Sequence, residues 1–114
     1  MNFKCKHTFN ERIKESMRVK FKYPTRIPII CEKSIKSTMD KIDKNKYLVQ
    51  DDITCGQFIY VIRQRLKLPP EKAIFLFVNG TIPCTSDGIL HIYNKEKDKD
   101  GFLYIKYSDE NVFG

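Results

Sequence analysis

The segment 102–107 carries apolar or aromatic side chains on both faces of an extended chain. Successive side chains of a strand point to opposite faces, so a strand of this kind belongs where both faces of a sheet are covered. The segment 27–33 shows the same pattern. Its alternating sets are Ile27, Ile29 and Cys31 on one side, and Pro28, Ile30 and Glu32 on the other. We therefore expect a sheet whose central strands lie between two layers of helix.

An amphipathic helix is predicted over residues 8–22. Its apolar residues recur at every fourth position, which places them in one stripe. That stripe consists of Phe9, Ile13, Met17 and Phe21. Thr8 followed by Glu11 fits a capping box, and Tyr23-Pro24 ends the pattern because the residue before proline resists helical geometry. We expect this helix to cover part of one sheet face.

A second helix is predicted over residues 54–66, before Pro69-Pro70. Ile59, Ile62 and Leu66 cluster on one face, and an adjacent stripe contains Phe58, Val61 and Arg65. This apolar arc is wider than one core contact requires. Two interpretations remain open: a deeply packed helix, or a helix whose Phe58/Val61 stripe borders a groove.

The remaining apolar runs predict short strands and one more helix. Residues 46–50 follow the segment 27–33 through a polar loop, which favours an antiparallel pair, and Asn79-Gly80 after the run 74–78 is a hairpin-turn signal. A short strand at 81–83 and a short helix at 88–94 complete the order. One α+β domain is expected, a ubiquitin-like β-grasp roll. It combines a four-stranded mixed sheet, a crossing helix and an N-terminal helical extension.

The net charge of +7 is concentrated near the N-terminus. Residues 1–26 hold eight Lys and Arg against two Glu, a balance of +6. Such a segment suits nucleic acid, anionic lipid or acidic peptides. Its basic residues are Lys4, Lys6, Arg12, Lys14, Arg18, Lys20, Lys22 and Arg26.

No pattern of an enzyme or metal site is found in the sequence. The four cysteines stand more than 20 residues apart, without Cys-x-x-Cys, and Cys31 and Cys55 are expected to be small buried hydrophobes. Glycine-rich phosphate loops and nucleophile motifs are missing. No run approaches the length of about 20 apolar residues that a membrane span needs. No secretory signal is visible, so a cytoplasmic location is expected.

Five stretches closely resemble the ubiquitin-like modifiers of autophagy, of the GABA-receptor-associated-protein and microtubule-light-chain type. Their order and spacing are more specific than any short motif, and together they span most of the chain. They are 21–33 (Phe-Lys-Tyr-Pro-Thr-Arg-Ile-Pro-Ile-Ile-Cys-Glu-Lys), 43–49 (Asp-Lys-Asn-Lys-Tyr-Leu-Val), 56–63, 75–79 and 101–114, which ends Asn-Val-Phe-Gly.

The resemblance implies covalent attachment through Gly114 to phosphatidylethanolamine. An activating enzyme would use ATP to form a thioester, and a conjugating enzyme would pass the chain to the lipid amine. Gly114 would be a reacting group of a substrate rather than a catalyst, no cofactor would be bound, and a cysteine protease would deconjugate the product. Whether Gly114 is the natural or a processed end stays open. The protein would be cytoplasmic, and membrane-associated on autophagosomes, cytoplasmic vesicles or a plastid-type organelle when lipidated.

The resemblance also implies docking of motifs in which an aromatic residue and a later aliphatic residue are separated by two intervening residues. The peptide would add a strand to the edge 46–50. The aromatic pocket would use Glu15, Val19, Pro28, Ile30, Lys46, Leu48 and Phe102. The aliphatic pocket would use Tyr47, Val49, Ile53, Phe58, Val61 and Ile62. Acids of the peptide would meet Arg26, Lys44, Lys46 and Arg65.

Gln50 departs from the family pattern, which has proline there, and this alters the rim of the aliphatic pocket. The expected organisation is an extension at 1–24, a ubiquitin-like domain at 25–108 and a tail at 109–114, monomeric in solution. Two alternatives remain: a peptide-binding adaptor that is not conjugated, and a basic nucleic-acid-binding protein. The latter is less favoured because no RNA-binding motif is present.

Overall fold

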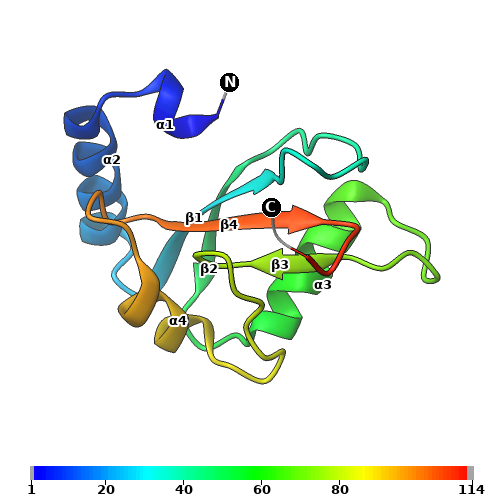
Figure 1. Ribbon diagram of the computed structural model, residues 1–114. Coiled ribbons are helices and arrows are strands. Elements are labelled where there is room, and N and C mark those ends of the chain that lie inside the picture. Colours follow the sequence, from blue (N-terminus) through cyan, green and yellow to red (C-terminus); the bar gives the residue numbers. More distant parts are fainter. Residues whose placement is uncertain (1, 113–114) are drawn as a thin grey trace.

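A four-stranded mixed sheet in the order β2-β1-β4-β3 organises the chain. The computed structural model describes residues 2–112 (Figure 1). β1 pairs antiparallel with β2 and parallel with β4, and β3 pairs antiparallel with β4. The elements are α1 (Phe3–Lys6), α2 (Phe9–Lys22), β1 (Arg26–Lys33), β2 (Lys46–Gln50), α3 (Cys55–Leu66), β3 (Phe75–Phe77), α4 (Ile89–Glu96) and β4 (Leu103–Ser108).

This arrangement confirms the predicted α+β class. The final strand is central, and the first two strands form an antiparallel pair. Between β2 and β3 in the chain, α3 crosses one face of the sheet (Figure 1). The predicted capping box of Thr8 with Glu11 forms. The structure adds a second one, of Thr54 with Gln57 at the start of α3. The expected strand at 81–83 is reduced to a bridge between Val78 and Thr81 across the Asn79-Gly80 turn.

Both sheet faces are covered, as the strand pattern predicts. In Figure 1, α1 and α2 lie on the left of the sheet and α3 lies on its right. The α3 side holds the larger core, which includes Ile27, Ile29, Cys31, Phe58, Ile62 and Leu103. On the α1 side, Phe3 packs against the fully buried Ile30 and Phe102, with ring centroids of Phe3 and Phe102 5.3 Å apart.

The apolar stripe of α2 does not face the sheet, contrary to prediction. Phe9, Met17 and Phe21 are 45%, 65% and 93% exposed. The buried residues of the helix are instead Ser16 and Val19. The spacing of apolar residues correctly identified which residues share one face of α2. Polar contacts, however, determine which face of the helix lies against the sheet.

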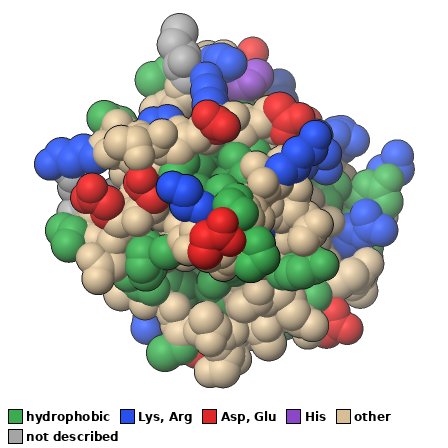
Figure 2. Space-filling model, turned by 90° about the vertical axis from the view of Figure 1, so that its right-hand side faces the viewer, with side chains coloured by type: hydrophobic (Ala, Val, Ile, Leu, Met, Phe, Trp, Pro, Cys, Tyr) green, Lys and Arg blue, Asp and Glu red, His purple; other side chains and the backbone are tan. Residues whose placement is uncertain are grey.

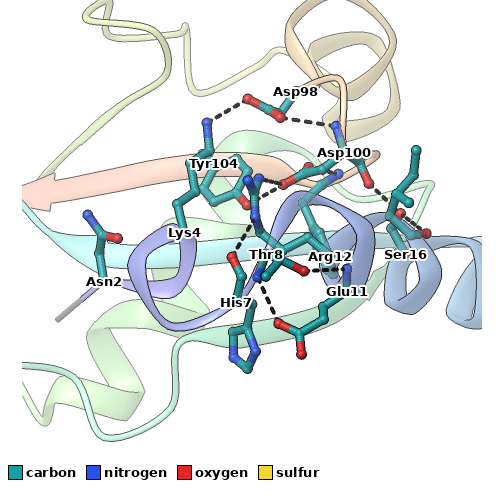
Figure 3. A network of polar contacts seen from close by, with 12 residues as sticks. Asn2, Lys4, His7, Thr8, Glu11, Arg12, Ser16, Asp98, Asp100 and Tyr104 are labelled. Atoms are coloured by element: carbon teal, nitrogen blue, oxygen red, sulfur yellow. Dashed lines mark hydrogen bonds and ion pairs between the residues drawn. The ribbon is translucent and has the colours of Figure 1, made fainter.

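Those contacts converge on Asp100, whose side chain is fully buried (Figure 3). One of its carboxylate oxygens accepts from Arg12 Nη1 and from the hydroxyl of Tyr104, each at 2.5 Å. The other accepts from the amide of Phe102 at 2.9 Å, and Ser16 Oγ donates to the Asp100 carbonyl at 2.5 Å. A buried carboxylate is stable only with such partners, so α2 is fixed with this polar side toward the sheet.

Two further contacts hold α1 against the rest of the domain. Lys4 Nζ lies 2.7 Å from Asp98 Oδ1, and the amide of Phe3 donates to Glu32 Oε2 at 2.8 Å. The segment is therefore a short helix that is anchored through its first two residues.

Close approach of α2 to the loop before β4 requires a glycine at position 101. Gly101 has φ +91°, and a Cβ there would lie 2.5 Å from Ser16 Oγ. We expect Gly101→Ala to lower the free energy of unfolding by about 2 kcal/mol or more, because it strains the backbone and displaces α2. Urea unfolding followed by circular dichroism measures this change.

Gly88→Ala is the matched control, since nothing lies within 4 Å of a Cβ at Gly88 and its φ is −69°. Its cost should stay below about 1 kcal/mol, the size of a helix-cap effect. Equal losses in the two variants would contradict the close-approach argument.

Candidate functional site

The open edge of β2 is the feature around which the candidate site is built. β2 is the first strand of the sheet order, so one side of its backbone has no neighbouring strand. Hydrogen bonds from Cys31 to Asn45 and from Asp51 to Thr25 set the ladder to β1. Because bonded pairs alternate in an antiparallel ladder, Tyr47 and Val49 bond to β1. The N–H and C=O groups of Lys46, Leu48 and Gln50 therefore point outward.

Side chains of β2 alternate between the two sheet faces. Leu48 stands opposite Pro28 and Lys46 opposite Ile30, on the side of α2. Tyr47 stands opposite Ile29 and Val49 opposite Ile27, on the side of α3. The β2 residues of the two expected pockets thus lie on opposite faces of one edge strand.

On the α2 side, the structure brings the expected aromatic-pocket residues together at unequal depth. Leu48 is half-buried, whereas Val19 and Pro28 are buried. Ile30 and Phe102 are fully buried beneath Phe3. Phe3 was not among the residues expected at the site. The only sequence signal for it was an aromatic residue close to the start of the chain.

An ion pair between Glu15 and Lys46 links α2 to β2. The Glu15 carboxylate lies 3.0 Å from Lys46 Nζ and 2.5 Å from Arg18 Nη2. Burial alone would raise the pKa of Glu15, but hydrogen bonds from Lys46 and Arg18 outweigh this effect and lower the pKa below its ordinary value. Glu15 is therefore an ionised bridge between α2 and β2, beside the residues of the expected aromatic pocket.

On the α3 side, several expected pocket residues are core residues. Phe58 and Ile62 are 0% exposed, and Phe58 packs edge-on against Tyr47 with ring centroids 5.7 Å apart. The accessible members are Val61, which is 37% exposed, and the half-buried Val49 and Ile53. Figure 2 shows this side of the molecule, where hydrophobic side chains gather in the middle of the view between charged ones.

Phe58 and Ile62 therefore fit the interpretation of α3 as a deeply packed helix. Of the two apolar residues Phe58 and Val61, only Val61 reaches the surface. Tyr47 is also buried. Its hydroxyl has no hydrogen-bond partner within residues 2–112, and burial raises its pKa above the ordinary value.

The expected cationic contacts are dispersed around the edge. Arg65 Nε lies 2.8 Å from Asp43 Oδ1. Lys44 Nζ lies 5.2 Å from the ring centroid of Tyr47, and the guanidinium carbon of Arg26 lies 5.0 Å from that of Tyr23. Lys46 is already paired with Glu15. An acidic ligand would have to compete with or join these contacts.

Gly114, the expected conjugation residue, lies outside the described residues. The segment leading to it is attached as far as Asp109, which accepts from Ser37 Oγ at 3.0 Å and from Thr38 Oγ1 at 2.5 Å. Asp109, the first residue of the expected tail, is thus hydrogen-bonded to the loop after β1.

A separate cleft of about 1000 Å³ opens between α1, the loop after β1 and β4. It lies beside the candidate edge and contains none of the expected pocket residues. Among residues 2–112, no group of three or more His, Cys, Asp and Glu side chains could hold a metal ion. Cys31 and Cys55 are buried as expected, and desolvation raises the pKa of Cys55 to about 11.

A mixed sheet crossed by α3, with a second helical layer from the N-terminus, defines a ubiquitin-like protein with an N-terminal extension. Comparison with known proteins agrees. The family profile described as "Autophagy protein Atg8 ubiquitin like" matches residues 11–114. Autophagy-related protein 8 of Candida glabrata is 55% identical over 99% of this chain and 96% of its own length. That of Saccharomyces cerevisiae is 56% identical over 98% and 96%.

Solved structures give the same result. Atg8 of Trypanosoma brucei superposes with a TM-score of 0.93 at 44% identity, covering 100% of this chain and 98% of that one. Plasmodium falciparum Atg8 in complex with a Plasmodium falciparum Atg3 peptide gives 0.91 at 32% identity, covering 99% of each chain. The chain therefore belongs to the Atg8 family of ubiquitin-like autophagy proteins, which are not enzymes. Within residues 2–112, no helix has the length and apolar character to cross a membrane.

The charge bridge at Glu15 makes a prediction. Lys46→Ala should raise the pKa of Glu15 toward its ordinary value, because one of its two cationic partners is removed. Carboxyl-detected NMR titration measures this pKa. Lys44→Ala is the control, since the Lys44 ammonium lies over the Tyr47 ring. An unchanged Glu15 pKa in the Lys46 variant would show that the bridge is not formed in solution.

Proposed function

We propose that this Atg8-family chain is a modifier attached through Gly114 to phosphatidylethanolamine, and that it recruits proteins through the β2 edge. The membrane would be that of the autophagosome, a cytoplasmic vesicle or a plastid-type organelle. Family membership supports lipid conjugation. The unpaired edge of β2, with apolar residues on both faces, supports the recruitment of proteins.

The conjugation proceeds in four steps. The Gly114 carboxylate attacks the α-phosphate of ATP on the activating enzyme, and pyrophosphate leaves. A cysteine thiol of that enzyme then displaces AMP to form a thioester, which is exchanged to a cysteine of the conjugating enzyme. The amine of phosphatidylethanolamine attacks this thioester, an amide forms and the thiol leaves. The solved Plasmodium relative in complex with an Atg3 peptide supports contact with a conjugating enzyme.

Peptide docking follows from the geometry of β2. The outward N–H and C=O groups of Lys46, Leu48 and Gln50 can pair with an extended peptide. Side chains of an added strand alternate between the faces, so an aromatic residue would reach Leu48, Pro28 and Val19. An aliphatic residue three positions further on would reach Val49, Ile53 and Val61. Lys46 at the rim attracts acidic residues, which aid encounter and orientation.

Lipid conjugation is tested with the activating and conjugating enzymes, ATP and liposomes containing phosphatidylethanolamine. We expect a mass increase of one phosphatidylethanolamine, less a water, at Gly114, and none in Gly114→Ala. No mass increase in the unmodified chain would reject conjugation and favour the adaptor that is not conjugated, whose peptide binding would survive Gly114→Ala.

Groove binding is tested with Leu48→Ala combined with Val61→Ala. Both side chains are accessible, whereas replacing the fully buried Phe58 would disturb the core. We expect affinity for an aromatic-x-x-aliphatic peptide to fall about tenfold or more, as for other buried interface anchors. Calorimetry measures the affinity. Tyr60→Ala, an exposed change on the same helix, should leave it unchanged. Equal affinity in the double variant would refute the groove assignment.

A further inference from the structure

The outward face of α2 is an apolar and basic surface that neither the fold nor the β2 edge uses. Met17 and Phe21 stand four residues apart and are 65% and 93% exposed. With their flanking basic residues they line a shallow hollow that is wide open to solvent. We call this the outer α2 surface, and its residues are Lys14, Met17, Arg18, Phe21 and Lys22.

Helical spacing makes these residues one continuous surface. Side chains four positions apart are neighbours on a helix, so Lys14, Arg18 and Lys22 form a row beside Met17 and Phe21. The contacts of Arg12 and Ser16 with the Asp100 loop hold the opposite side of α2 against the domain. The outer α2 surface is thereby presented in a fixed orientation.

Charge defines the kind of partner that fits this surface. Three basic side chains and no acidic ones line the hollow. A symmetric contact with a second copy would bring these like charges together, which is unfavourable. An anionic bilayer would attract the basic residues, but only Met17 and Phe21 could insert, and membrane binding depends on the apolar area that a helix buries. An acidic segment with one or two apolar side chains matches both the charge and the hollow.

The outer α2 surface is also continuous with the β2 edge. Arg18, which lines the hollow, is paired with Glu15, and Glu15 is paired with Lys46 on β2. One row of charges thus runs from the outside of α2 to the strand where a peptide is proposed to add. A ligand bound at the edge can extend along this row onto the helix.

We propose that the outer α2 surface binds an acidic, apolar-containing segment that flanks the motif bound at the β2 edge. This inference rests on the proposed peptide-binding function and assigns a second contact to the same ligands. It predicts that Met17, Phe21 and the adjacent basic residues select among partners that share an aromatic-x-x-aliphatic core but differ in their flanks.

The test compares synthetic peptides by calorimetry. One contains only the aromatic-x-x-aliphatic core. Two others carry the core with an extension of about twelve residues, before or after it, with Glu and Leu at helical spacing, enough to follow this face of α2. We expect one extension to raise affinity at least tenfold. Met17→Ser with Phe21→Ser should abolish this gain and leave binding of the core peptide unchanged.

Matched controls separate surface chemistry from general effects. Ile35→Ser, at a 97% exposed position outside α2, should preserve the gain, and Lys14→Glu with Lys22→Glu should abolish it. An extension with Gln in place of Glu should give little gain. If the gain persists in Met17→Ser/Phe21→Ser, or neither extension produces one, the inference is wrong.

The outcome is distinguishable from failure of the proposed function. If the core peptide does not bind the unmodified chain, the extension alone is titrated by NMR. Amide shifts confined to residues 14–22 would then support the surface, and shifts elsewhere would overturn it. Two other occupants of the surface are tested by binding to phosphatidylserine vesicles and by sedimentation equilibrium. If vesicle binding or dimerisation requires Met17 and Phe21, and the peptide extensions do not raise affinity, the inference is overturned.

Discussion

The buried carboxylate of Asp100 determines how the N-terminal helices sit on the sheet. A charge without solvent exposure is stable only where it is paired and hydrogen-bonded, and removing one partner of such a pair costs about 3–5 kcal/mol. Arg12, Tyr104 and the amide of Phe102 supply these bonds. Desolvation and the hydrogen bond to Asp100 both raise the pKa of Tyr104, so its hydroxyl remains a donor. The polar side of α2 is therefore its inner side.

Much of the fold was predictable because it follows from local rules. The pattern of apolar residues on the two faces identified β1 and β4, and a short apolar run after a polar loop identified β2. Turn chemistry identified Asn79-Gly80, and a capping box placed the start of α2. The orientation of α2 was not predictable in this way. Its stripe at every fourth residue is a local pattern, whereas the pairing of Arg12 with Asp100 joins positions 88 residues apart. A pairing over that separation leaves no periodic signal.

The candidate site was predicted in outline but not in depth. The resemblance selected residues that the fold does gather on the two faces of β2. It could not show that Phe58, Ile62 and Phe102 are fully buried, because a side chain in the core and a side chain lining a pocket are both apolar in sequence. Packing alone distinguishes Leu48 and Val61, which reach the surface, from their buried neighbours. Phe3 was missed because a four-residue helix has no amphipathic period.

The shortness of β2 has a consequence for selectivity. Unpaired strand edges invite edge-to-edge aggregation, and short length with lysine on the edge is a common protection. Only Lys46, Leu48 and Gln50 offer outward backbone groups, so few hydrogen bonds are available to any strand that arrives. A passing extended chain, including a second copy of this one, would be held too weakly to persist. Stable binding at the edge must therefore depend on side-chain contacts, so β2 selects its ligands by their sequence and does not bind extended chains in general.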